Sequence, residues 1–296
     1  MTYRSVFRPN LFAGQRIIVT GGGSGIGRCT AHELAALGAA VALVGRNPDK
    51  LAAVSREIAE TDAFPATCHI CDIRKPDDVT RTIQEVLSAG QPISGLVNNA
   101  GGQFSSPLKD ISPNGWDAVV RNNLTGGFLM ARECFRNSME AHGGAIVNIL
   151  ADMWRSMPGM GHSGAARAGM LNLTMTAAVE WAYAGVRVNA VAPGFIASSG
   201  LKNYPPEMRA KFQNQQSHVP LKRFGTESEV SAAIVFLLSE AASFISGSCL
   251  RVDGAAPNAR FDWEMLDHDR SVPYRGFELE TELDFLTLPN TVKREA

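Results

Sequence analysis

The sequence predicts a doubly wound α/β fold, in which helices cover both faces of a seven-stranded parallel sheet. Short apolar segments alternate with helical patterns from the N-terminus to about residue 256. These segments are apolar throughout, which is typical of parallel strands buried on both faces. A glycine-rich turn connects the first apolar segment to the first helical pattern. Regular alternation of this kind places ligands at the carboxyl ends of the strands.

Each element is expected from its own pattern. Strands are predicted over the short apolar runs at residues 16–20, 40–44, 66–71, 94–97, 145–150, 187–192 and 249–252. Helices are predicted where apolar residues recur with helical spacing, near residues 25–38, 49–60, 76–88, 113–140, 163–184 and 227–239. The segment 195–225 shows no strand pattern and interrupts the alternation.

One sheet domain is therefore expected over residues 1–256, followed by a C-terminal extension over residues 257–296. The extension contains several aromatic residues, namely Phe261, Trp263, Tyr274, Phe277 and Phe285. Because disordered segments are poor in aromatic residues, we expect the extension to pack on its own core or on a neighbouring subunit.

Composition excludes several classes of function. The 296 residues carry a net charge of −1, which offers no basic surface for nucleic acid. No apolar run has the length of a membrane span, and residues 1–15 do not resemble a secretory signal, so a cytoplasmic location is expected. Five scattered cysteines fit reduced thiols. Cys68 and Cys71 have metal-ligand spacing, but alternation along a strand points them to opposite faces, and no metal site is predicted.

The glycine-rich turn indicates a nucleotide site. It reads Thr20-Gly21-Gly22-Gly23-Ser24-Gly25-Ile26-Gly27 and lies between a predicted strand and a predicted helix. Glycines allow the backbone to approach a pyrophosphate, and the helix N-terminus presents unpaired N–H groups to its charge. The second strand then ends at Gly45-Arg46, with no acidic residue to accept hydrogen bonds from a ribose 2′-hydroxyl. Since an arginine pairs with a 2′-phosphate, NADP(H) is favoured over NAD(H).

Further motifs resemble those of the short-chain dehydrogenase/reductase family from about residue 10 to residue 256. They are the glycine turn, Asp72, Asn98-Asn99-Ala100-Gly101, Asn123-Leu124-Thr125-Gly126, Val188-Asn189-Ala190-Val191-Ala192 and Pro193-Gly194. The resemblance implies a one-domain Rossmann oxidoreductase that uses a nicotinamide cofactor and forms a homo-oligomer, a tetramer or a dimer. The residues that match the family's cofactor contacts, from the phosphates through the adenosine to the nicotinamide, are Gly21, Ser24, Ile26, Gly27, Asp72, Ile73, Asn99, Gly101, Pro193, Gly194 and Ile196.

The catalytic positions of the family are altered in this chain. Ser163 stands at the position of the family's tyrosine, and Arg167 at that of its lysine. Ala151 replaces the serine that polarises a carbonyl, and only Asn123 matches the family's proton relay. A serine hydroxyl is a much weaker acid than a tyrosine beside a cation, and arginine does not release its proton in proteins. Ordinary interconversion of alcohol and ketone is therefore poorly supported.

The segment 162–169 resembles the peroxisomal trans-2-enoyl-CoA and 2,4-dienoyl-CoA reductase branch of the family. That resemblance implies hydride transfer to a carbon–carbon double bond conjugated to a thioester. Asn123 and Ser163 are then expected to stabilise charge on the thioester oxygen, and Arg167 to position the nicotinamide ribose. His162 is a candidate acid because histidine is the residue type best suited to proton transfer near neutral pH. Its alternative roles are to cap the helix that follows or to face a subunit contact.

Three functions remain open at this stage. The leading hypothesis is an NADP(H)-dependent reductase of trans-2-enoyl-CoA, whose small-molecule partner is an acyl-CoA. The second is an alcohol or aldehyde dehydrogenase for branched terpenoids of the citronellol and citronellal type, since bacterial relatives in acyclic terpene catabolism look similar. The third is a dinucleotide-binding homologue without catalysis, which the altered positions favour and the intact glycine turn and Asn123 oppose.

Overall fold

Seven parallel strands form the central sheet of the computed structural model, which describes residues 3–61, 63–204, 206–280 and 283–286. The strands are β1 (Arg16–Thr20), β2 (Ala40–Gly45), β3 (Thr67–Ile70), β4 (Ile93–Asn98), β5 (Gly144–Ile149), β6 (Val186–Pro193) and β9 (Cys249–Val252). Their order across the sheet is β3-β2-β1-β4-β5-β6-β9, and all neighbours pair in parallel. The predicted fold class is confirmed. The order reverses between β1 and β4, where such sheets bind ligands.

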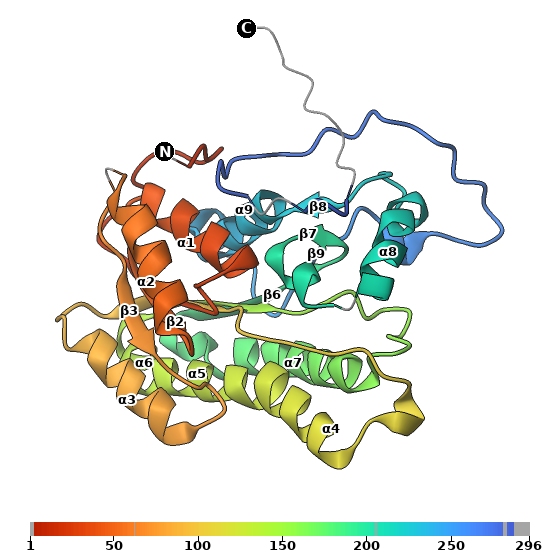
Figure 1. Cartoon of the computed structure of the whole chain (residues 1–296). Helices are drawn as coiled ribbons and strands as arrows, with labels where there is room; N and C mark the ends of the chain where they lie inside the picture. Colours follow the sequence, from red (N-terminus) through yellow and green to blue (C-terminus); the bar gives the residue numbers. More distant parts are fainter. Residues whose placement is uncertain (1–2, 62, 205, 281–282, 287–296) are drawn as a thin grey trace, which may run out of the picture.

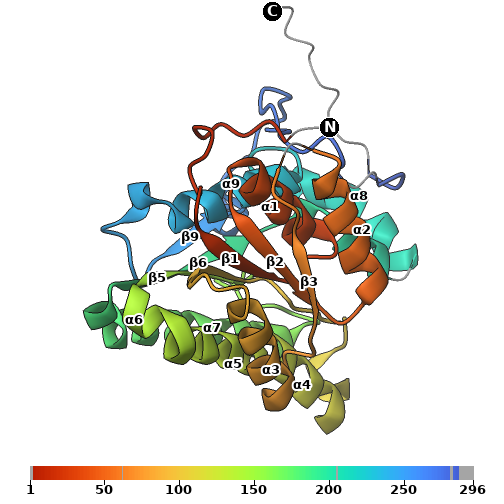
Figure 2. The same ribbon diagram turned by 90° about the vertical axis from the view of Figure 1, so that its left-hand side faces the viewer.

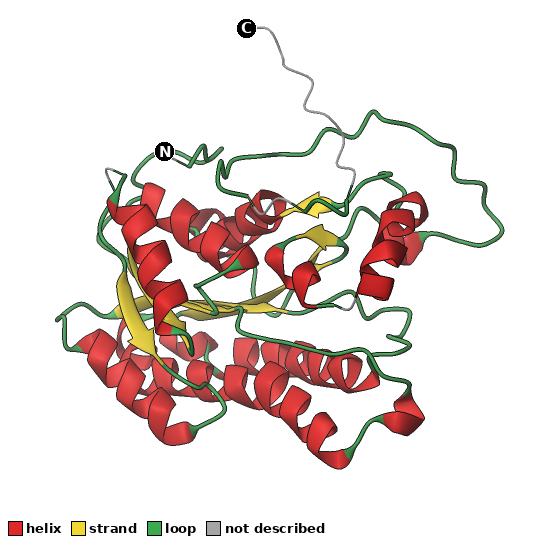
Figure 3. Cartoon of the chain, viewed as in Figure 1, coloured by secondary structure: helices red, strands yellow, loops and turns green. Residues whose placement is uncertain are grey.

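Helices cover both faces of the sheet and enclose two apolar cores (Figures 1 and 2). One face carries α1 (Gly25–Ala36), α2 (Pro48–Ala59) and α9 (Glu227–Leu238). The other carries α3 (Pro76–Leu87), α4 (Pro113–Val120), α5 (Gly126–Cys134), α6 (Glu140–His142) and α7 (Gly161–Glu180). Figure 3 shows the resulting three layers, with the strands between two sets of helices. Burial on both faces explains why the central strands β1, β2, β4, β5 and β6 are mostly apolar, whereas the edge strand β3 is largely exposed.

The single helix predicted over residues 113–140 is interrupted twice. π-helical turns at Arg121–Thr125 and Phe135–Met139 separate α4, α5 and α6. In the first turn the Asn123 side chain donates to the Val119 carbonyl oxygen at 3.0 Å, which engages an acceptor of the helix backbone. Such π-helical turns are frequent at functional sites, and this one holds the family's relay asparagine.

The segment 195–225 contains more regular structure than its sequence predicts. The short strands β7 (Ile196–Ala197) and β8 (Gly225–Thr226) pair in parallel as a second sheet, and α8 (Pro206–Gln215) lies between them. The prediction that this segment lacks a strand is therefore wrong. Two-residue strands are too short to leave a periodic pattern in a sequence. They anchor both ends of a long connection beside the carboxyl ends of the central strands (Figure 1).

Residues 274–280 and 283–286 of the extension contact the core of the same chain. The side chain of Phe277 is 4% exposed, its ring stacks on that of Tyr3 with centroids 5.9 Å apart, and it packs against His32. The backbone N–H groups of Gly276 and Phe277 both donate to Ser228 at the start of α9. Leu283 and Leu286 join a separate apolar cluster with Phe212 and Phe224. Two of the aromatic residues, Phe261 and Trp263, are exposed and pack on nothing in this chain's described part.

Three further sequence expectations concern a membrane span, a pair of cysteines and a metal site. Among the described helices, none combines the length and the apolar character needed to cross a bilayer. Cys68 is exposed in β3, and Cys71, which follows the strand, is buried. The described residues contain no group of His, Cys, Asp and Glu side chains with the arrangement of a metal site.

The contact between the extension and the core can be measured by substitution. Phe277→Ala removes a buried ring and leaves a cavity among Tyr3, Cys29 and His32, so we expect it to lower the free energy of unfolding by about 3–5 kcal/mol. Phe261→Ala is the matched control, because that ring is fully exposed and its removal leaves no cavity. Urea unfolding of both variants and of the wild type makes the comparison. Equal midpoints for all three would show that the extension does not stabilise the domain.

Candidate active site

The glycine turn adopts the conformation that a phosphate site requires. Gly21 has φ +67°, and a Cβ atom there would lie 2.8 Å from the Asn99 Nδ2 atom. A Cβ atom on Gly27 would collide with the Gly21 carbonyl oxygen. Ser24 precedes α1, is exposed, and makes no capping hydrogen bond with its hydroxyl. The hydroxyl and the first N–H groups of α1 are thus arranged to bind a pyrophosphate.

Thr20 and Asn99 hold this turn against the end of β4. The Thr20 hydroxyl donates to the Val97 carbonyl oxygen at 3.2 Å and accepts from the N–H groups of Asn99 and Ala100, each at 2.9 Å. The Asn99 side chain donates to the Thr20 carbonyl oxygen at 2.9 Å. Asn99 lies where the family places the adenosine ribose, and its amide also fixes the turn that would hold the phosphates.

The residues expected at the adenine end have different environments. Asp72 forms a two-point ion pair with Arg74, at 2.8 and 2.6 Å, and this lowers the pKa of the Asp72 carboxyl to about 2. The Ile73 side chain is 5% exposed and packs on Gly126, so it belongs mainly to the core. Arg46 is exposed at the end of β2 and forms no salt bridge within the described ranges. Its guanidinium is therefore available to an anionic ligand.

Pro193, Gly194 and Ile196, which are expected near the nicotinamide, follow one another at the end of β6. The Gly194 N–H donates to the Val252 carbonyl oxygen at 2.9 Å, and a Cβ atom at this glycine would lie 2.8 Å from the Asp253 Cα atom. Ile196 is 6% exposed and pairs with Gly225 in the small sheet. Close packing thus places this segment beside the ends of β5 and β9.

Gly101, Asn123 and Arg167 converge on one point opposite that segment. A Cβ atom on Gly101 would lie 2.7 Å from both the Arg167 Nη2 and the Asn123 Oδ1 atoms, so only glycine fits. The Asn123 side chain donates to the carbonyl oxygens of Gly102 at 2.7 Å and Val119 at 3.0 Å, and accepts from the Gly102 N–H at 3.1 Å. Because both amide hydrogens are engaged, Asn123 holds the loop after β4 in place.

Arg167 brings a charge into the interior. Its Nη1 atom donates to the Ile149 carbonyl oxygen, whereas its Nε atom is buried without a partner among the described residues. Burial lowers the pKa of Arg167 to about 10, so the guanidinium still carries its charge at neutral pH. No carboxylate of the described chain pairs with it. The Nη2 atom of the same guanidinium lies beside Gly101. The family's lysine position implies that this group contacts the hydroxyl groups of a nicotinamide ribose.

Ser163 and His162 lie in the first turn of α7, and both are completely buried. The His162 Nδ1 atom accepts from the Ser163 N–H at 2.8 Å, while its Nε2 atom has no partner among the described residues. The imidazole contacts the Phe104 ring edge-on, with centroids 4.5 Å apart. His162 thus satisfies a backbone N–H at a helix start, which matches its alternative role as a cap.

A hydrogen-bonded chain that the sequence did not predict begins at Ser163. The Ser163 hydroxyl donates to the Gln103 Oε1 atom at 2.6 Å, and the Gln103 Nε2 atom donates to the Tyr204 hydroxyl at 2.9 Å. Gln103 and Tyr204 are 101 residues apart, on the connections that follow β4 and β7. Neither residue belongs to a motif, so no local signal in the sequence pointed to the pair.

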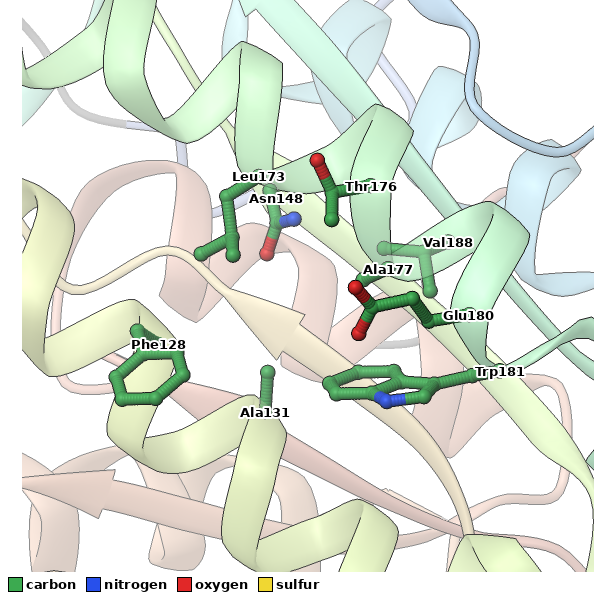
Figure 4. Close-up of a pocket in the computed structure, with 9 residues that line it drawn as sticks. All are labelled: Phe128, Ala131, Asn148, Leu173, Thr176, Ala177, Glu180, Trp181 and Val188. Carbon is green, nitrogen blue, oxygen red and sulfur yellow. The ribbon is translucent and has the colours of Figure 1, made fainter.

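A separate pocket lies away from this site, between α5 and α7 (Figure 4). Phe128 and Trp181 face it from the two helices, and the Glu180 carboxylate points into it. Most of its lining is apolar, and its walls include neither the glycine turn nor Arg167. The pocket therefore does not belong to the candidate site described above.

The chain resembles known proteins over most of its length. Residues 21–255 match the family model described as Enoyl-(Acyl carrier protein) reductase. The crystal structure of the citronellol catabolism dehydrogenase AtuB from Pseudomonas aeruginosa is 58% identical, with a TM-score of 0.78, and the match covers 86% of this chain and 99% of that one. A "Probable 2,4-dienoyl-CoA reductase" from Bacillus subtilis is 38% identical over 241 residues, 80% of this chain and 94% of the relative.

A third relative was crystallised with a dinucleotide. It comes from Beutenbergia cavernae, is assigned as an NAD(P) dependent gluconate 5-dehydrogenase, and contains NADP at low occupancy. It is 33% identical to this chain, with a TM-score of 0.78, and the match covers 85% of this chain and all of the relative.

Proposed function

This chain belongs to the short-chain dehydrogenase/reductase family, and from that premise we propose that it interconverts a branched acyclic terpenoid alcohol and its aldehyde, using NADP(H). The observation that carries the proposal is the 58% identity to AtuB, which extends over 99% of that protein. The sequence alone favoured an enoyl-CoA reductase, for which the relatives are more distant, at 38% identity or less.

The described side chains suit such a reaction in part. A nicotinamide cofactor supplies or accepts the hydride when it is bound. Arg167 would position the ribose of that cofactor with its guanidinium, whose Nη2 atom lies beside Gly101. Asn123 donates a hydrogen bond to the Gly102 carbonyl oxygen, and it would thereby hold the loop after β4 in the position that the ligand requires. Ser163 is buried beneath Gln103 and would act on a substrate through that residue.

Reduction of a double bond conjugated to an acyl-CoA thioester is the second candidate. It is favoured by the 38% identity to the Bacillus subtilis relative and by the absence of a tyrosine at position 163 and a lysine at position 167. In that reaction the hydride goes to the β-carbon, and the α-carbon takes a proton from water or from a side chain. Hydrogen-bond donors that face the substrate near Ser163 would then stabilise the negative charge that develops on the thioester oxygen.

NADP(H) is proposed as the cofactor because of the charge at the end of β2. Arg46 is exposed there, and no acid stands at the end of the strand to accept hydrogen bonds from a ribose 2′-hydroxyl. Asp72, the nearest acid of the adenine site, is already neutralised by Arg74. The NADP found in the Beutenbergia cavernae relative supports the same choice.

Assembly into a homo-oligomer is proposed from the surface of α5 and α7. Three large apolar side chains there are exposed: Phe128, Met175 and Val179, the last at 79%. The pocket of Figure 4 lies on the same face and is lined mostly by apolar groups. Contiguous apolar surface of this kind marks a protein interface, and a second copy would cover it.

The proposed reaction is tested by following NADPH absorbance with purified protein. We expect oxidation of NADPH with citronellal, and reduction of NADP with citronellol. Turnover of trans-2-enoyl-CoA or 2,4-dienoyl-CoA without turnover of either terpenoid would establish the second candidate instead. Binding of NADPH without turnover of any of these compounds would show a dinucleotide-binding homologue that does not catalyse.

Cofactor choice is tested at Arg46. Arg46→Glu replaces the positive charge by a negative one, so we expect NADPH to bind about 100-fold more weakly while NADH binding changes little. Arg56→Glu, an exposed substitution in the last turn of α2, makes the same change of charge elsewhere and is the control. Titration of both variants with the two dinucleotides gives the affinities. Equal losses for NADPH and NADH would contradict a 2′-phosphate contact.

The oligomeric state is tested by sedimentation velocity. We expect a dimer or a tetramer of the 31.7 kDa chain, and Val179→Glu should shift it toward the monomer because the charge would be buried at the interface. A wild-type protein that sediments as a monomer at micromolar concentration would exclude this assembly.

A further inference from the structure

The chain lacks a tyrosine where its family carries the proton donor, but a tyrosine hydroxyl reaches the same region from another element. The sequence contains four tyrosines. Tyr3 packs on the C-terminal extension, Tyr183 bonds to Glu140 on an exposed surface, and Tyr274 donates to the Arg4 carbonyl oxygen. Among the four, Tyr204 is the one that is connected to the start of α7, through Gln103 to Ser163 and directly to the N-cap residue Met160.

Burial distinguishes Tyr204 from Ser163. The Ser163 hydroxyl is inaccessible and donates its hydrogen to the Gln103 Oε1 atom at 2.6 Å. A substrate therefore cannot contact Ser163 unless it displaces Gln103. A tyrosine at position 163 with the same side-chain direction would extend past that hydroxyl, into the region that Gln103 and the Tyr204 hydroxyl occupy. The Tyr204 side chain is only partly buried, and the hydrogen bond between its hydroxyl and Gln103 is exposed.

The hydrogen bonds leave the phenolic proton of Tyr204 available. The Gln103 Nε2 atom donates to the Tyr204 oxygen at 2.9 Å, so the phenol acts as an acceptor in that bond. Its own proton is directed to the Met160 Sδ atom at 4.0 Å. A thioether is a weak acceptor, and a carbonyl oxygen of a substrate would replace it readily. The amide N–H would also stabilise the negative charge left on the phenol oxygen after proton transfer.

Packing fixes the ring in this position. Tyr204 meets Phe212 of α8 edge-on, with centroids 5.3 Å apart, in the cluster that also contains Leu283 and Leu286 of the extension. The ring is thus held from one side by the connection after β7 and from the other by Gln103 of the loop after β4. Placement on packed neighbours is what a catalytic group requires.

We propose that Tyr204 is the catalytic acid of this chain and that Gln103 is its positioning residue. The proposal rests on the function proposed above. In the reducing direction the carbonyl carbon gains a hydride from the reduced nicotinamide, the C=O π pair moves to the oxygen, and that oxygen takes the proton of the Tyr204 hydroxyl. Solvent then returns a proton to the phenolate. Oxidation of the alcohol follows the reverse order, with the phenolate as base.

Kinetics of Tyr204→Phe test the role, since this variant keeps the ring and its contact with Phe212. We expect kcat to fall at least 100-fold, with KM changed less than about threefold and the affinity for NADPH unchanged. Tyr183→Phe is the matched control, because it removes an exposed hydroxyl that bonds to Glu140 and should leave kcat unaltered. Gln103→Ala keeps the phenol of Tyr204 but removes the hydrogen bond that positions it, so we expect it to lower kcat by a smaller factor of about 10.

A binding measurement separates this proposal from the proposed reaction. The probe is 3-methylbutyramide, an unreactive branched carbonyl compound, titrated calorimetrically into the NADPH-loaded protein. We expect Tyr204→Phe to weaken its binding about 10-fold, whether or not the wild type turns over citronellal. Loss of this binding difference, a wild-type protein that does not bind the amide, or an unchanged kcat in Tyr204→Phe would each overturn the role of Tyr204. Absent turnover with a preserved binding difference would refute only the proposed reaction.

Discussion

The Thr20 hydroxyl joins the ends of the two central strands, and the arrangement of the cofactor site depends on it. It binds β4 through one carbonyl oxygen and two N–H groups, at the point where the strand order reverses. The glycine turn on one side and the loop with Gly101 on the other thereby keep a constant separation. A dinucleotide bound as proposed would span both, and the spacing between its phosphates and its nicotinamide ribose would then depend on one side chain that need not touch it.

The interior beyond this junction is held by polar groups whose hydrogen bonds are mostly made within the loops. Asn123 uses both amide hydrogens on backbone carbonyls, and Arg167 uses one nitrogen on the Ile149 carbonyl oxygen. Within the described chain, the buried Arg167 Nε, His162 Nε2 and Asn98 Oδ1 atoms have no partner. Buried donors without partners are costly. A ligand that satisfies them gains both binding energy and orientation.

The sequence was informative where structure is local and repetitive. The seven strands and the helices on both faces follow from apolar runs and helical spacing, and the glycine turn follows from a motif. The sequence was uninformative about contacts between loops that are far apart along the chain. β7 and β8 are two residues each, and the Gln103–Tyr204 bond links side chains outside any motif. The leading hypothesis changed from an enoyl-CoA to a terpenoid substrate for a related reason. The short segment around Ser163 resembles the enoyl-CoA reductase branch, whereas the whole chain resembles AtuB more closely than it resembles the Bacillus subtilis relative.

The burial of Glu33 in α1 affects how the chain folds while it is being synthesised. Its carboxylate is buried and accepts hydrogen bonds from Ser5 at 2.7 Å and from Ser231 at 2.5 Å, a residue 198 positions later, and burial raises its pKa. On the ribosome, α1 emerges long before α9 can cover it. Until then Glu33 faces water, and the first βαβ units lack one layer of their core. The nascent chain should therefore stay exposed to chaperones until nearly its full length has been translated, and a truncated message would yield no stable half-domain.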